Sequence, residues 1–157
     1  MIMNRARLIP ALLLALVGSV LGGCSSTSYQ LVPPPVDEQE APAEDQCRVY
    51  IVRASNGWGK IREVEIIDRD TKIGSLGTNS YLCWDREPGR HSMQILFHGS
   101  VLTDGVMEGI LWFEGEAAGT YYYEVNLRQS DRKPEAKLLK PEEGRAMVAE
   151  RSAAEPR

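Results

Sequence analysis

The sequence predicts an all-β fold, an antiparallel β-sandwich of about 7–8 short strands that occupies residues 47–140. Short runs rich in β-branched and aromatic residues recur throughout this stretch. Turn-forming Gly, Pro, Asn and Asp residues separate these runs at close spacing. Because no connection between the runs has room for a crossover helix, a parallel α/β arrangement is disfavoured.

The strands are expected one after another, each bounded by turn residues. They are expected at residues 47–54, 61–68, 71–76, 80–85, 90–98, 110–114, 121–127 and 136–140. The connections are expected as a loop at 55–59, turns at 68–70, 77–79, 87–89 and 116–119, and a longer segment at 99–109. Such short connections are typical of hairpins in antiparallel sheets.

Alternation of side chains predicts which face of each strand is buried. In the first strand Val49 and Ile51 face one way and Tyr50 and Val52 the other, and in the fifth strand Met93, Ile95 and Phe97 alternate with Ser92, Gln94 and Leu96. In the strand at 121–127, Tyr122 lies on the face opposite Tyr123, so we expect Tyr122 to be exposed.

Residues 141–157 are expected to form a short helix and a frayed tail. Pro141 is favoured in the first turn of a helix, and the acids at 142 and 143 lie near the positive end of the helix dipole. Gly144 weakens this helix because glycine has a low helix propensity.

The first 24 residues have the features of an export signal. Two arginines precede an apolar run at 8–21, which is short for a membrane span. The run ends in Leu21-Gly22-Gly23-Cys24, which resembles the processing site of bacterial lipoproteins. Residues 1–23 are therefore interpreted as a lipoprotein signal peptide that is removed. The alternatives are an ordinary secretory signal with a chance cysteine, or an uncleaved anchor.

The resemblance to lipoproteins implies that Cys24 carries the membrane anchor. Its sulfur would bear a diacylglyceryl group and its amine an acyl chain such as palmitate, and more than one chain gives stable anchoring. Ser25, where an aspartate would imply retention in the inner membrane, implies sorting to the outer membrane. The folded domain would then face the periplasm.

Residues 24–46 are predicted to be a disordered tether between the lipid and the domain. The segment is rich in proline and acidic residues and poor in large apolar residues, so it cannot bury enough surface to fold by itself. Three consecutive prolines favour a semi-stiff polyproline spacer. Its reach would be roughly 25 Å as a coil and roughly 70 Å as polyproline II.

Two cysteines remain in the expected domain, Cys47 and Cys83. In an oxidising compartment we expect them to form a disulfide, which the chain-entropy model values at roughly 4 kcal/mol. Two separate buried thiols are the alternative. A metal site is disfavoured because no histidine pair lies nearby.

Several turn and strand motifs resemble a family of small bacterial lipoproteins that carry a domain of unknown function. The motifs are Lys72-Ile73-Gly74-Ser75-Leu76, Tyr81, Glu87-Pro88-Gly89-Arg90-His91 and Ala118-Gly119-Thr120-Tyr121-Tyr122. Similar motifs occur in PEGA-like and transthyretin-like sandwiches. The resemblance covers roughly residues 47–140 and implies the fold; it carries over no catalytic residue.

The sequence shows no catalytic constellation. With 18 Lys and Arg against 22 Asp and Glu, and no basic stripe, nucleic-acid binding is not expected. His91 and His98 would face opposite sides of one strand, which does not suit a shared metal. A calcium site at the 68–70 turn is a weak alternative, because one short turn supplies few oxygen ligands. We therefore predict no cofactor and no metal, and a hydrolase is the least favoured class.

Trp58 and Tyr122 are the candidate binding surface. Trp58 lies between two glycines in a loop, where a large ring gains little unless it contacts a partner, although it could also fold back over the sandwich. We expect a non-catalytic binding or structural module that contacts an envelope protein. The alternative is a domain that binds glycan or peptidoglycan fragments through these aromatics.

Overall fold

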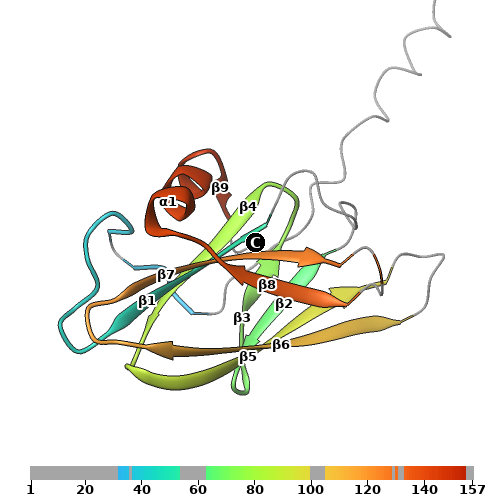
Figure 1. Ribbon diagram of the computed structural model, residues 1–157, viewed down its shortest axis with the longest axis horizontal. Coiled ribbons are helices and arrows are strands. Elements are labelled where there is room, and N and C mark those ends of the chain that lie inside the picture. The colour runs from blue at the N-terminus through green and yellow to red at the C-terminus, as the bar shows by residue number, and fades with distance from the viewer. Residues whose placement is uncertain are drawn as a thin grey trace, which may run out of the picture.

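The computed structural model describes residues 32–35, 37–53, 63–99, 105–128, 130 and 133–154, and the expected strands are present within them (Figure 1). The elements are β1 (Cys47–Arg53), β2 (Val64–Asp68), β3 (Thr71–Leu76), β4 (Ser80–Arg86), β5 (Gly89–His98), β6 (Val106–Gly115), β7 (Thr120–Leu127), β8 (Pro134–Leu138), α1 (Pro141–Ala149) and β9 (Ser152–Ala153). The sequence did not predict β9. The C-terminal helix was expected, and Pro141 begins it.

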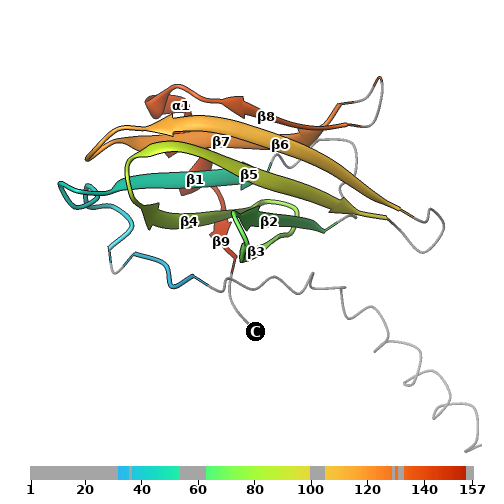
Figure 2. The same ribbon diagram turned by 90° about the horizontal axis from the view of Figure 1, so that it is seen from below.

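The strands form two sheets that face each other (Figure 2). One sheet has the order β8-β7-β1-β4-β9 and the other the order β3-β2-β5-β6. The all-β sandwich is thus confirmed. Its pairing is antiparallel except that β1 pairs in parallel with β7 and β4 with β9. The parallel pair β1–β7 needs no crossover helix. Between these two strands in sequence, the chain forms the four strands of the opposite sheet, and these make the connection.

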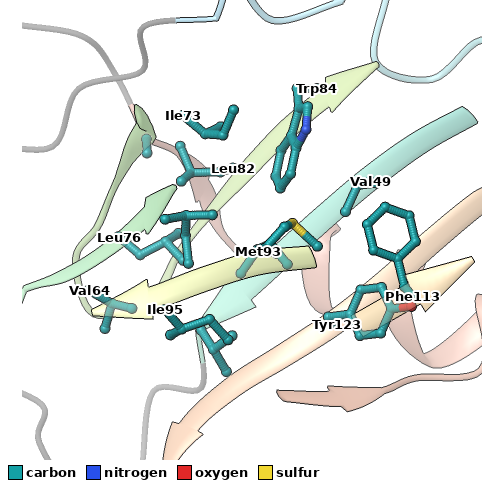
Figure 3. Packing of buried hydrophobic residues seen from close by; sticks show 14 of the residues in the cluster. Val49, Val64, Ile73, Leu76, Leu82, Trp84, Met93, Ile95, Phe113 and Tyr123 are labelled. Carbon is teal, nitrogen blue, oxygen red and sulfur yellow. The ribbon is translucent and has the colours of Figure 1, made fainter. Parts of the chain in front are cut away.

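The core lies between the two sheets, as Figure 3 shows. Its largest fully buried side chains include Val49, Ile51, Leu82, Trp84, Met93, Ile95 and Phe97. The face of β5 that carries Met93, Ile95 and Phe97 is the buried one, whereas β1 is buried at every position. Burying each such side chain contributes about 1.5–3 kcal/mol, so this layer is the main source of stability.

Tyr122 is buried, which corrects the prediction that it is exposed. Its side chain is 8% exposed and stacks on Tyr50, with 4.8 Å between ring centroids. The reason is that α1 packs on the outer face of the five-stranded sheet, at Tyr122 (Figure 1). A Cβ at Gly144 would lie 2.2 Å from Tyr122 Cγ, so the glycine allows this close approach. The candidate surface of Trp58 and Tyr122 therefore loses Tyr122.

The predicted disulfide between Cys47 and Cys83 is wrong in this structure, where both cysteines are reduced and buried. In the β1–β4 pair, Cys83 lies opposite Tyr50, three positions along β1 from Cys47. An odd separation places two side chains on opposite faces of a sheet. Cys47 accordingly belongs to the core between the sheets, whereas Cys83 belongs to the cluster on the outer face with Tyr50.

We expect both thiols to stay reduced and to resist alkylation in the native protein. Burial raises the pKa of Cys47, and it raises that of Cys83 to about 12, so little reactive thiolate forms near neutral pH. Peptide mapping without reductant is expected to recover two free cysteines, with alkylation only after unfolding. A peptide that links Cys47 to Cys83 would contradict the structure.

Strand β6 begins at Val106, within the segment that the sequence assigned to a long connection. The glycine at 109 interrupts the expected pattern. It is needed there because β8 crosses closely, and a Cβ on Gly109 would lie 2.8 Å from Pro134 Cβ. Two of the outer strands, β6 and β8, therefore meet along one side of the sandwich, and β3 and β4 meet along the other.

Candidate functional site

The outer face of the four-stranded sheet carries large apolar side chains that are exposed. Val106, Ile110 and Trp112 project from β6 and are 55%, 56% and 61% exposed. Alternation places them on one face of β6, together with Glu108 and Glu114. We call these five residues the β6 face. Exposed apolar side chains that lie together mark interaction surfaces more often than those scattered singly.

Polar and charged groups border the β6 face. The Arg90 guanidinium lies over Trp112, with its carbon 5.3 Å from the ring centroid. Farther along the same side of the sheet, Glu65 pairs with Lys72 Nζ at 2.9 Å and with His98 Nε2 at 3.1 Å. An apolar centre with a rim of both charges is the usual composition of a protein–protein interface.

A second polar cluster is buried near the edge where β3 and β4 meet. Asp68 Oδ2 accepts a hydrogen bond from Trp84 Nε1 at 3.1 Å and is paired with Arg86. A pocket of about 190 Å³ lies beside them, lined by Val32, Asp68, Arg69, Thr71, Ile73, Trp84, Asp85 and Arg86. Asp68, which the sequence placed at the start of the 68–70 turn, is thus part of a buried ion pair.

The pair of Asp68 and Arg86 leaves polar atoms unsatisfied in the structure. Asp68 Oδ1, Arg86 Nε and His91 Nδ1 are buried without a hydrogen-bond partner. Buried atoms of this kind are commonly satisfied by ordered water. Among the described residues, no group of three or more His, Cys, Asp or Glu side chains is placed to hold a metal ion.

His91 is a buried histidine that we expect to be neutral. Its Nε2 lies 2.8 Å from the Glu87 carbonyl oxygen, which can only accept, so Nε2 carries the hydrogen and donates a hydrogen bond to this oxygen. Burial lowers the pKa of His91, and the positive charge of Arg86 lowers it further. The expectation that His91 and His98 face opposite sides of β5 is confirmed.

The neutral state of His91 predicts a pH dependence of stability. Because the pKa of His91 in the folded protein lies below the ordinary histidine value of about 6.5, the unfolded chain takes up the proton first as the pH falls. The free energy of unfolding is thus expected to decrease as the pH drops below about 6.5. His91→Gln is expected to flatten this slope, and His98→Gln serves as the control on the same strand. An unchanged slope in His91→Gln would contradict this assignment.

Two of the residues predicted from the sequence, Cys24 and Trp58, lie outside the described residues. Trp112 was not predicted as a site residue. The signal for it is the run Ile110-Leu111-Trp112-Phe113, which is apolar on both faces of a strand that lies at the edge of its sheet. One face of such a strand packs on the core and the other meets solvent. Phe113 takes the buried face and Trp112 the exposed one.

No protein-family model matches the chain, and a comparison with curated proteins finds no significant match. The resemblance to small lipoproteins therefore stays a prediction. Within the described residues, none of the helices is both long and apolar enough to cross a membrane.

Proposed function

We propose that this chain is an outer-membrane lipoprotein, anchored through lipid on Cys24, that acts as a non-catalytic binding module and contacts an envelope protein through the β6 face. The observation that carries the binding role is the exposure of Val106, Ile110 and Trp112 on one side of the sandwich. The anchor rests on the Leu21-Gly22-Gly23-Cys24 motif. A protein partner would remove three large apolar side chains from water.

The two outer faces of the sandwich favour this assignment of the surface. On the five-stranded sheet, α1 and the segment at 37–40 lie against the tyrosines of the outer face. On the outer face of the four-stranded sheet, by contrast, the apolar side chains of the β6 face are exposed. Tryptophan and arginine are both enriched among the residues that dominate binding energy at interfaces, and Trp112 and Arg90 lie side by side here.

We expect that replacing Ile110 and Trp112 together by serine weakens partner binding by about 30-fold or more, since central aromatic contacts contribute at least about 2 kcal/mol. Stability is expected to change little because both side chains are already exposed. The measurement is quantitative capture from solubilised envelopes by wild type, by this variant and by Leu138→Ser, a matched exposed position on β8. A protein retained equally by all three would not be bound through the β6 face.

The exposed ring of Trp112 also supports a second candidate, a domain that binds peptidoglycan fragments. Aromatic side chains on the face of a sheet can stack on apolar faces of ligands. Because Tyr122 is buried, Trp112 replaces it as the candidate stacking residue. Titration of tryptophan fluorescence with muropeptides tests it, with Trp112→Phe as the control. A saturable change that is lost in Trp112→Phe would favour the glycan over the protein partner.

A further inference from the structure

The segment at 37–46, which we call the strap, is docked on the domain, although the sequence predicted that it is part of a disordered tether. Arg48 holds one part of it. The Arg48 side chain binds Asp85 through Nε at 2.6 Å and Nη2 at 3.0 Å. Its Nη1 donates to the carbonyl oxygens of Asp37 at 3.0 Å and Glu40 at 2.6 Å. Arg48 is 4% exposed, so these contacts are shielded from water.

Two tyrosines of the outer face hold the strap at Glu38. The Tyr50 hydroxyl donates to the Glu38 carbonyl oxygen, and the Tyr81 hydroxyl donates to the Glu38 carboxylate, both at 2.5 Å. Pro42 is also buried. At the end of the strap, Ala118 N–H donates to the Gln46 carbonyl oxygen at 2.7 Å. The domain therefore holds the strap along its length, because residues of the domain supply the hydrogen-bond partners for the strap.

Before the strap, Val32 contacts the domain a second time. It packs against the core and lines the pocket beside Ile73 of β3 and Trp84 of β4. In Figure 2 this N-terminal segment, drawn in blue, runs below β4, on the opposite side of the sandwich from β8. Val32, the first described residue, thus lies at the edge where β3 and β4 meet.

We propose that the strap is a latch that shortens the tether and holds the domain close to the membrane, with the β3–β4 edge toward the lipid and β6 at the opposite edge of its sheet. This inference rests on the proposed anchor at Cys24. Eight peptide steps separate Cys24 from Val32, which span at most about 28 Å. With the strap and Val32 released, 23 steps separate Cys24 from Cys47, and the limit rises to about 80 Å.

The latch is tested first by proteolysis of the full-length protein in detergent with a glutamate-specific protease. Tyr50→Phe/Tyr81→Phe removes both hydroxyls that bind Glu38 and keeps the rings. Cleavage after Glu38 and Glu40 is expected to accelerate by about 30-fold, the factor for two lost hydrogen bonds of ordinary strength. Tyr123→Phe, which alters the core face of the same sheet, is expected to leave the rate unchanged. Rapid cleavage of the wild-type strap, or equal rates in all three proteins, would overturn the latch.

The distance between the domain and the membrane is tested by energy transfer from the tryptophans of the lipidated protein to a dansyl-labelled lipid in vesicles. Transfer is expected to be stronger for wild type than for Tyr50→Phe/Tyr81→Phe, since the latched domain lies closer to the lipid. Equal transfer would overturn the short tether. Cys24→Ser separates this inference from the proposed function: vesicle binding by that unlipidated variant would refute the anchor, while the proteolysis result would still decide whether the strap is latched.

Discussion

Arg48→Ala is expected to lower the free energy of unfolding by about 3–5 kcal/mol, the usual cost of removing one partner of a buried ion pair. The substitution leaves the Asp85 carboxylate without its guanidinium and removes both donors to the strap carbonyls. Chemical denaturation followed by circular dichroism measures the change. Arg48→Lys is expected to recover only part of it, because an ammonium group cannot bind Asp85 and two carbonyls with the planar geometry of the guanidinium.

The matched control for Arg48 is Arg128→Ala, which breaks an exposed ion pair with Glu135. Exposed pairs contribute about 0–1 kcal/mol, so this variant is expected to unfold at nearly the wild-type denaturant concentration. A loss of similar size in both variants would show that the burial of Arg48 has no special role. Loss of strap protection in Arg48→Ala, with the sandwich still folded, would agree with the structure.

Gly144→Ala is expected to destabilise the protein by about 1–3 kcal/mol, although alanine favours helices by about 1 kcal/mol over glycine. The added methyl group would lie 2.2 Å from Tyr122 Cγ and 2.4 Å from Tyr122 Cβ. These atoms are fixed to the backbone of β7, so α1 must move away from the sheet. Thermal denaturation measures the effect, and near-ultraviolet circular dichroism reports the changed packing of Tyr122.

Ala146→Gly provides the comparison for Gly144→Ala, because position 146 is exposed on the same helix. There helix propensity alone acts, and the variant is expected to lose about 0.5–1 kcal/mol. Destabilisation by both opposite substitutions is the result that the packing of α1 on Tyr122 predicts. Stabilisation by Gly144→Ala would mean that α1 does not pack on the tyrosine in solution.

The layered β fold could be predicted from the sequence because its signals are local. Alternation within 90–98 identified the buried face of β5, and the turn residues located the hairpins. The start of β6 was missed because Gly109 is explained by Pro134, which is distant in sequence. The exposure of Tyr122 was predicted wrongly for the same reason, since α1 covers a face that alternation marks as outer.

The predictions for the cysteines and the tether depended on tertiary contacts that composition does not carry. Two cysteines in one domain suggested a disulfide, but the register of β1 and β4 places them on opposite faces. The strap has the composition of a disordered segment, and it is ordered by Arg48, Tyr50 and Tyr81 of the domain. A buried arginine and tyrosine hydroxyls on an outer face indicate that another segment covers them.

The most direct test of the proposed function is photo-crosslinking in intact cells from position 112 on the β6 face. The same photoreactive residue at position 143, exposed on α1, is the control. If the β6 face contacts an envelope protein, position 112 gives one discrete adduct that position 143 lacks. Identical adducts from both positions, or adducts to glycan alone from position 112, would contradict a protein partner at the β6 face.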